Sequence, residues 1–345
     1  KKKLITDLDL FYMQKIPVKS IVITGTNGKS TACKLIQHIL KTNKLDAPLG
    51  GNIGKPILNL KIKKKSIVII EASSFQLSYT KFLKPNFAAI LNISSDHLDW
   101  HKTIKNYKDS KFKIFSKQDI NDVALLNNKK LIKLFEKKNY LSKLKVIKKN
   151  ALNKIVKKKI TNDYLISDPN IENLTFAYEI SKLFKIKEKT FLKAVNDFKG
   201  LSHRHEIFLK KKNITFINDS KATSFESTKH ALKNNRNIYW IFGGLPKLGD
   251  KFNFKGIGSN IIKSFIIGKK TTYFKNQIKN KIKYKISYNL KDAIKDVFEE
   301  LILSKSDKVT ILFSPASASY DQFENFVDRG NQFKKAIKDY AKRFL

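Results

Sequence analysis

Short apolar runs alternate with segments of helical pattern along the first 200 residues of the chain. The runs at 21–24, 66–71, 87–92 and 123–127 are almost continuously apolar, which is typical of strands buried on both faces. Helices are expected after the first three runs, and residues 170–184 and 188–198 predict two more. This alternation predicts an α/β domain with a doubly wound, mostly parallel sheet.

The same alternation begins again after residue 200. Runs at 214–218, 238–242, 264–268 and 309–314 predict strands, while 224–234, 291–303 and the amphipathic stretch 322–343 predict helices. We therefore expect two domains, 1–200 and a smaller, Rossmann-like α/β domain at 201–345. The lysine-rich residues 128–160 predict only peripheral helices and hairpins, and the glycines at 50–54 predict a compact loop.

The first predicted strand breaks into a glycine-rich turn that ends in Lys-Ser-Thr. Two glycines let backbone N–H groups turn toward phosphate oxygens, and the following helix adds its positive N-terminal end. Lys29 can reach the β- and γ-phosphates, and a hydroxyl of Ser30 or Thr31 can bind Mg²⁺. A strict Walker A motif has glycine where Ile23 stands, so this is a shortened variant, and a glycine-rich turn without a ligand is the alternative. We interpret the first domain as a nucleotide-binding P-loop domain.

Charge and composition narrow the class of protein. The 345 residues include 70 Lys and Arg against 29 Asp and Glu, a net charge of +41, so a polyanionic partner has to be considered. The excess is lysine scattered through the chain without a nucleic-acid module, and a biased codon composition explains it equally well. The single cysteine, Cys33, excludes an internal disulfide and fits a reducing cytosol. Without an apolar run near ~20 residues, we expect a cytoplasmic protein with no membrane span.

Two groups of polar residues follow strands of the first domain. Glu71 ends the run 66–71 and is suited to bind Mg²⁺ beside a phosphate loop, although a solvated carboxylate at a strand end is the plain alternative. Residues 96–101 contain Asp96, His97, Asp99 and His101. This segment predicts either a metal and substrate cluster or a polar turn that caps the next helix through serine 94 or 95. Mg²⁺ with one imidazole ligand fits it better than zinc.

The second domain carries a further set of candidate groups. Arg204 and Lys221 could clamp phosphate, and Asp219 could accept a hydrogen bond from a ribose, whereas a simple helix cap explains residues 218–220 about as well. Small hydroxylated residues at 314–319 predict an anion-accepting loop, and Lys247 follows a glycine pair after a strand.

The motifs at 24–31, 71–76, 96–99, 203–204, 218–223 and 314–330 have the order and spacing of the Mur ligases, a family that this chain resembles over nearly its whole length. The phrases NDSKAT, SPASASYDQF and FVDRGNQF resemble the D-glutamate-adding members. The resemblance implies ATP-driven amide formation between UDP-N-acetylmuramoyl-L-alanine and D-glutamate through an acyl phosphate. It thereby implies a role in peptidoglycan synthesis, cell-wall formation, cell shape and division. We expect a monomer that binds no nucleic acid.

The resemblance also implies roles for individual residues. The ATP phosphates would be held by the glycine-rich turn, that is by Gly25, Thr26, Asn27, Gly28, Lys29, Ser30 and Thr31. Further ATP contacts are implied for Asn170, Asn173, Arg204 and Asp219. Catalysis would depend on Lys29, Glu71, His97 and Lys111, with two Mg²⁺ sites formed by Ser30 with Glu71 and by His97 with Lys111, a lysine that the family carbamylates. Asn52 and Ser73 would contact the muramoyl substrate, and the D-glutamate pocket would consist of Thr223, Lys247, Ser319 and Phe326.

Two departures from the family pattern are visible. Only about twenty residues precede the first predicted strand, so we do not expect the family's N-terminal UDP-binding domain in this chain. Leu245 and Pro246 stand where the family commonly has a polar or acidic residue and glycine. Two alternatives remain open: a related ligase for another amino acid, such as a folylpolyglutamate synthase, and a basic P-loop ATPase that binds nucleic acid in a salt-sensitive manner.

Overall fold

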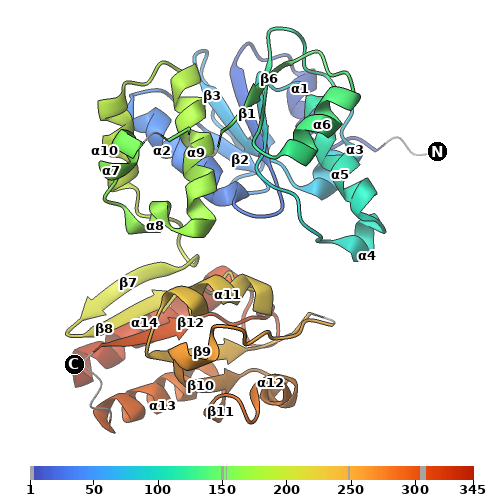
Figure 1. Cartoon of the computed structure of the whole chain (residues 1–345). Coiled ribbons are helices and arrows are strands. Elements are labelled where there is room, and N and C mark those ends of the chain that lie inside the picture. The colour runs from blue at the N-terminus through green and yellow to red at the C-terminus, as the bar shows by residue number, and fades with distance from the viewer. Residues whose placement is uncertain (1–3, 149–150, 153, 248, 304–307) are drawn as a thin grey trace. The chain divides into compact units, whose positions relative to one another are not determined.

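The computed structural model describes the chain except residues 1–3, 149–150, 153, 248 and 304–307 (Figure 1). It forms two compact units, Lys1–Gly200 and Leu201–Leu345. Each unit has its own sheet and its own apolar core clusters, two in the first unit and two in the second within the described residues.

The sheet of the first unit is parallel throughout its described part. Its order is β2-β3-β1-β4-β5-β6. The strands are β1 Lys19–Thr24, β2 Leu49–Gly51, β3 Ile67–Glu71, β4 Phe87–Ile90, β5 Val123–Leu126 and β6 Lys143–Val146. The register pairs Ile23 with Glu71 and Thr24 with Ile90, so the carboxyl ends of β1, β3 and β4 meet at one edge. In open parallel sheets this edge is where ligands bind.

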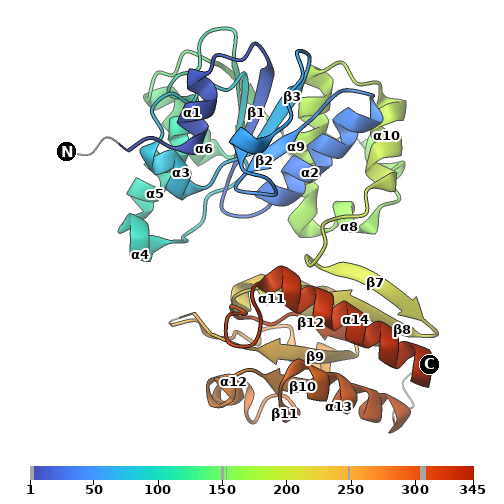
Figure 2. The same cartoon turned by 180° about the vertical axis from the view of Figure 1, so that it is seen from behind.

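Helices cover both faces of this sheet (Figures 1 and 2). They are α1 Asp7–Met13, α2 Lys29–Thr42, α3 Ser74–Tyr79, α4 Leu98–His101, α5 Ile104–Phe112, α6 Lys129–Lys137, α7 Lys154–Lys158, α8 Asp163–Ile166, α9 Asp168–Leu183 and α10 Glu188–Asp197. Ile21 and Ile23 pack into the core cluster with α2, α9 and α10, while Val22 packs into the opposite cluster with α1, α3, α5 and α6. Because neighbouring strand residues point to opposite faces, two covered faces require an unbroken apolar run.

Helix α1 is attached to the rest of the unit by a buried carboxylate. Asp9 Oδ1 accepts hydrogen bonds from Thr80 Oγ1 at 2.6 Å, Lys81 N at 2.8 Å and Phe82 N at 2.7 Å. Burial raises the pKa of Asp9, but its hydrogen bonds lower that pKa by more, and the net shift is downward. The carboxylate therefore links α1 to the segment that follows α3.

The second unit has a mixed sheet of order β11-β10-β9-β12-β8-β7, in which β7 is antiparallel to β8. Its strands are β7 Glu206–Lys211, β8 Ile214–Asn218, β9 Ile238–Gly243, β10 Ile261–Ile267, β11 Tyr284–Tyr288 and β12 Val309–Phe313. Helices α11 Phe225–Asn234 and α12 Thr271–Ile278 pack on one face, and α13 Leu290–Leu303 and α14 Phe326–Phe344 pack on the other.

The expected α/β class is confirmed, with a parallel P-loop sheet followed by a smaller α/β unit. Several elements were not predicted. Residues 49–51 form strand β2 rather than only a glycine loop, and β6 pairs in parallel with β5, so the hairpins expected within 128–160 are wrong there. Residues 149–150 and 153 of that stretch lie outside the described residues. Strands β7 and β11 and helices α1 and α12 were also not foreseen.

The final helix begins later than predicted, at Phe326 instead of residue 322. The Ser319 carbonyl accepts hydrogen bonds from the backbone N–H groups of Gln322 and Phe323, which makes a turn there. The Asn325 side chain then caps α14 by accepting from the N–H groups of residues 327 and 328. In its described part the chain has no helix that is both long and apolar enough to cross a membrane.

Candidate functional site

The glycine-rich turn between β1 and α2 forms a loop at the carboxyl edge of the first sheet. Gly28 is the N-cap of α2 with φ 83°, a conformation that side chains rarely adopt. A Cβ at this position would lie 2.2 Å from Asn173 Oδ1, so any other residue would also have to displace this side chain of α9. The turn therefore has the backbone of a phosphate-binding loop at a helix N-terminus.

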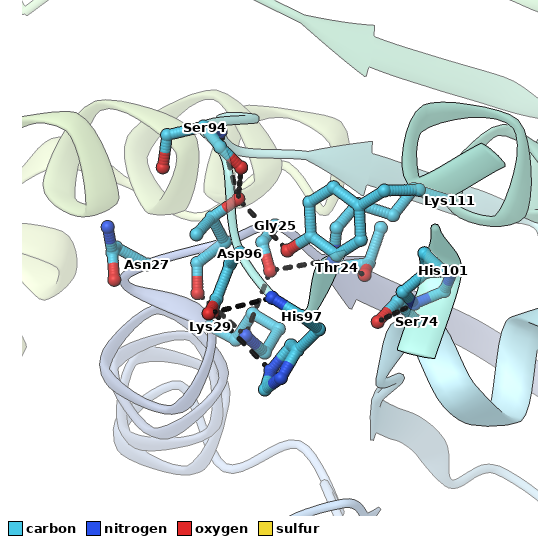
Figure 3. Close-up of polar contacts among 12 residues, drawn as sticks. Thr24, Gly25, Asn27, Lys29, Ser74, Ser94, Asp96, His97, His101 and Lys111 are labelled. Carbon is cyan, nitrogen blue, oxygen red and sulfur yellow. Dashed lines mark hydrogen bonds and ion pairs between the residues drawn. The ribbon is translucent and has the colours of Figure 1, made fainter. Parts of the chain in front are cut away.

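Two lysines converge on one carbonyl of this loop. Lys29 Nζ donates to the carbonyl oxygens of Gly25 at 2.8 Å and Thr26 at 2.9 Å. Lys111 Nζ, from α5, donates to the same Gly25 oxygen at 2.9 Å and lies 3.4 Å from Thr24 Oγ1. Figure 3 shows both side chains directed at Gly25. The arrangement places two amino groups, one of them the Lys29 ammonium, at the point where the loop would meet an anion.

Lys111 is almost completely buried, with 1% of its surface exposed. Burial, followed by the nearby charge of Lys29, lowers the pKa of Lys111 to about 7. Its ammonium lies 4.6 Å from the centre of the Tyr107 ring. A substantial fraction of this lysine is therefore an unprotonated amine near neutral pH.

Glu71, at the end of β3, is buried beside the phosphate loop. Its Oε1 accepts a hydrogen bond of 2.7 Å from Asn52 Nδ2, whereas Oε2 is buried without a hydrogen-bond partner among the described residues. A buried carboxylate oxygen without a partner is costly unless a cation binds it. Mg²⁺ in nucleotide sites is commonly held by one or two carboxylates together with water and phosphate oxygens, so this oxygen fits such an ion.

The two histidines of the segment after β4 differ in environment. His101 is buried, its Nε2 lies 3.0 Å from Ser74 Oγ, and burial lowers its pKa. His97 is more exposed, packs against Phe75 at 4.9 Å between ring centres, and lies 3.4 Å from Asp96 Oδ2 through Nε2. The alternative of a helix cap through serine 94 or 95 does not hold, because His97 itself, with φ 52°, is the N-cap of α4. His97 is thus the more exposed imidazole of the pair, with 41% of its side chain accessible.

Tyr107, which was not predicted, and several predicted residues of the first unit lie around the loop. The Tyr107 hydroxyl lies 3.0 Å from Thr26 Oγ1, which also receives a 3.0 Å hydrogen bond from the Ser94 N–H. Asn173, one of the predicted ATP contacts, is buried and donates from Nδ2 to Asn170 Oδ1 at 3.2 Å. Asn52 is exposed, and Ser73 is the half-buried N-cap of α3. Tyr107 carries no motif, and only its position four residues before Lys111 could have suggested it.

In the second unit a buried arginine joins two of the predicted loops. Arg329 donates through Nη2 to the carbonyl oxygens of Ser220 at 2.7 Å and Ser317 at 3.0 Å, and through Nε to Ser220 Oγ at 3.0 Å. The loop after β9 pairs with the same region, because the N–H groups of Leu245 and Ala318 each donate to the other residue's carbonyl. Segments far apart in sequence therefore meet at the carboxyl edge of the second sheet.

The residues predicted for a D-glutamate pocket are only partly brought together by described contacts. Phe326 accepts a hydrogen bond at its carbonyl from Ser220 Oγ, and Lys221 Nζ lies 3.9 Å from the centre of its ring. Ser319 is buried, Thr223 is half-buried, and Lys247 is exposed.

Asp219 is held by hydrogen bonds inside the unit. Its Oδ2 accepts from Ser314 Oγ at 2.7 Å and its Oδ1 accepts from His205 N at 3.0 Å. Burial raises the pKa of Asp219 to about 7, against the opposing effect of these hydrogen bonds and of the Arg204 charge. This carboxyl therefore changes charge near neutral pH.

Both the sequence and the fold of this chain are similar to those of known proteins. Residues 23–191 match the Mur ligase middle domain. The UDP-N-acetylmuramoylalanine–D-glutamate ligase of Rickettsia prowazekii is 35% identical over 97% of this chain and 79% of that protein. The chain belongs to the Mur ligase family. The enzyme of the same name from Oenococcus oeni is also 35% identical to this family member, over 92% of the chain and 76% of the relative.

Solved structures agree on the fold of this Mur ligase. MurF from Thermotoga maritima in complex with ADP has a TM-score of 0.67 at 14% identity, over 96% of this chain and 82% of that one. FolC of E. coli in complex with ADP has a TM-score of 0.63 at 13% identity, over 96% of this chain and 93% of that one. Members of the family use ATP and generally Mg²⁺, which agrees with the loop and the buried carboxylate described above.

Proposed function

We propose that the chain is the ligase that adds D-glutamate to UDP-N-acetylmuramoyl-L-alanine, driven by ATP, in peptidoglycan synthesis. The observation that carries this proposal is the match over nearly the whole chain to relatives that bear this name at 30 to 35% identity. A ligase for another amino acid is disfavoured because relatives at 33 to 35% identity bear the name of the D-glutamate ligase.

The reaction requires two displacements. A carboxylate oxygen of the muramoyl substrate attacks the γ-phosphorus, the bond to the β-phosphate oxygen breaks, and ADP leaves. The amine nitrogen of D-glutamate then attacks the acyl carbon, loses a proton, and displaces phosphate with the bonding electron pair. Such chemistry depends mainly on positioning and on neutralising negative charge.

The residues of the first unit are suited to these tasks. The backbone N–H groups of the loop and the Lys29 ammonium would bind and orient the phosphates of ATP, with further contacts from Asn170 and Asn173. From the second unit, Arg204 and Asp219 would also contact ATP. Bound Mg²⁺ would supply charge neutralisation at the phosphate oxygens.

Two pairs of residues would hold the metal ions. Ser30 and Glu71 would hold one Mg²⁺. The Oε2 of Glu71, which has no hydrogen-bond partner in the part of the chain that the structure describes, supports this assignment. His97 and a carbamylated Lys111 would hold the second. Carbamylation consumes an unprotonated amine and CO₂ and yields a carbamate and a proton, so the lowered pKa of Lys111 favours it.

The carbamate can be detected directly. Incubation with ¹³C-bicarbonate is expected to give one carbamate resonance whose intensity rises between pH 6.5 and 8, as the amine loses its proton. The Lys111→Arg variant should lack it. A resonance of equal intensity in that variant would assign the modification elsewhere.

For substrate recognition, Asn52 and Ser73 would contact the muramoyl substrate, and Thr223, Lys247, Ser319 and Phe326 would receive D-glutamate. Lysine and hydroxyl groups are appropriate partners for its two carboxylates.

Phosphate release tests the function. The purified chain is incubated with ATP, Mg²⁺ and UDP-N-acetylmuramoyl-L-alanine, with and without D-glutamate; L-glutamate, lysine and diaminopimelate serve as matched controls. Release that requires both the muramoyl substrate and D-glutamate is expected. Release that is independent of any amino acid would contradict the proposal and favour a P-loop ATPase of another kind.

A further inference from the structure

Glu172, on α9, connects the loops that follow two neighbouring strands. Its Oε2 accepts a hydrogen bond of 2.6 Å from Asn92 Nδ2, after β4, and its Oε1 accepts one of 2.7 Å from Asn127 Nδ2, after β5. Both carboxylate oxygens are therefore engaged by amide groups. Hydrogen bonds to a charged acceptor are stronger than those between neutral groups.

Asn92 in turn holds the phosphate loop. Its Oδ1 accepts from Asn27 N at 2.9 Å, its Nδ2 lies 3.3 Å from the Asn27 carbonyl oxygen, and its own carbonyl accepts from Thr26 N at 2.9 Å. Two successive residues of the loop are thus fixed by one asparagine. The next residue of α9, Asn173, lies against Gly28, so the same helix supports the loop from a second direction.

The chemistry of these groups fixes the direction in which each hydrogen bond of the network is donated. A carboxylate can only accept hydrogen bonds, so the amide of Asn92 has to present its NH₂ to Glu172. Its oxygen is then left facing the loop, where it meets the Asn27 N–H. With the amide reversed, a donor would face that N–H and the loop would lose this contact.

We propose that Glu172 is a positioning residue for ATP: it sets the orientation of Asn92 and thereby the shape of the phosphate loop. This inference rests on the proposed function, because it assigns ATP to that loop. A purely structural Glu172 would stabilise the packing of α9 without changing the affinity for ATP in particular.

The decisive comparison uses three variants of the full chain. In Glu172→Gln, the remaining side-chain oxygen can accept a hydrogen bond from only one of the two asparagines. The new NH₂ group faces the NH₂ group of the other asparagine, and neither can accept. In Asn92→Asp, two carboxylates face each other. In the double variant the amide introduced at position 172 can donate to the carboxylate introduced at position 92, which restores the native hydrogen bond in the reverse direction. Only the 3.3 Å contact with the Asn27 carbonyl is lost. The second oxygen of that new carboxylate still accepts from the Asn27 N–H. Glu188→Gln, in an exposed ion pair with Lys159, is the matched control.

We expect each single variant to bind ATP about tenfold more weakly by calorimetry, about 1.4 kcal/mol. The KM for ATP should rise in parallel, with the KM for D-glutamate unchanged. The double variant should recover to within about threefold of the wild type, and Glu188→Gln should not differ from it.

Other outcomes would overturn the inference. ATP affinity of Glu172→Gln equal to that of the wild type would do so, as would a double variant as weak as the singles. If a single variant fails to fold, the double variant carries the test, and its failure to fold would also count against the orientation argument. Wild-type chain that binds no ATP would instead refute the proposed function itself, and the inference with it.

Discussion

Two buried side chains, Lys111 and Asp219, titrate near neutral pH although their ordinary pKa values lie far apart. Burial lowers the pKa of the first and raises that of the second, in each case to about 7. Burial disfavours the charged form of both. Such shifts are frequent at functional sites, where burial and neighbouring charges tune the pKa of the groups that act there.

The effect of Asp219 on stability has a definite sign. Because its folded pKa is raised from 3.8 to about 7, the folded state binds more protons than the unfolded state between these values. The stability that the protonated Asp219 carboxyl contributes to the folded state is fully present below about pH 4 and is lost as the pH rises through 7. Between pH 4 and 7, the free energy of unfolding in urea should therefore fall for the wild type relative to the Asp219→Asn variant. The difference should change by at most about 4 kcal/mol over this range. Parallel pH profiles would show that the carboxyl is not shifted in this way.

Lys29 is predicted to act on turnover and not on folding. Its ammonium donates to two carbonyl groups of the loop, and these can be hydrated when the side chain is removed. Lys29→Ala should reduce ATP-dependent phosphate release by about 100-fold or more, with little change in unfolding free energy. Lys34→Ala, on the same helix and bonded to Gln37, is the control and should retain normal turnover. Near-normal turnover of Lys29→Ala would remove Lys29 from the mechanism.

At the level of elements, helix α1 depends on one carboxylate. Removing Asp9 leaves the Thr80 hydroxyl and the N–H groups of residues 81 and 82 without their acceptor. Asp9→Ala is expected to destabilise the first unit by about 2–4 kcal/mol in guanidinium unfolding. Asp7→Ala, whose carboxylate receives a longer 3.3 Å bond from Gln76, should cost about 1 kcal/mol or less. Equal effects of the two substitutions would contradict the anchoring role of Asp9.

The elements that were predicted correctly share a physical property. Strands β1, β3, β4 and β5 are covered on both faces, and burial of this kind imposes an apolar run that can be recognised locally. Strand β6 lies at an edge and alternates lysine with Leu144 and Val146, so its sequence carries no such signal. Strand β2 is short and glycine-rich, and its pairing with β3 is what makes it a strand.

The residues of the candidate site also fall into those that could be predicted from the sequence and those that could not. The phosphate loop, Glu71 and the 96–101 segment could be proposed because they follow strands directly. Glu172 could not, because its role depends on Asn92, 80 residues earlier, and on the direction in which an amide points. The structural role of Arg329 could not be predicted for a similar reason, because its partners Ser220 and Ser317 come from two other segments of the chain.

At the scale of the whole molecule, each unit has a complete sheet and its own core clusters. A fragment of residues 201–345 should therefore fold alone and unfold cooperatively by circular dichroism. A fragment of residues 201–303 lacks β12, which pairs with both β8 and β9, and is expected to stay unfolded. Non-cooperative melting of the longer fragment would show that the second unit needs the rest of the chain.

The central place of β1 in the first sheet affects how the protein is made. Both of its neighbours, β3 and β4, are translated later, and at about 5–20 residues per second the ribosome needs about 3 to 13 s to go from Thr24 to Ile90. Until β3 has been translated the apolar residues of β1 have no partner strand, and until Ile90 has been translated they lack β4. Lysines 15 and 19 are charges beside these residues that can discourage association between nascent chains. The phosphate loop lies near the start of the domain in sequence, yet its contacts with Asn92 and Asn173 can form only after those later residues have been translated.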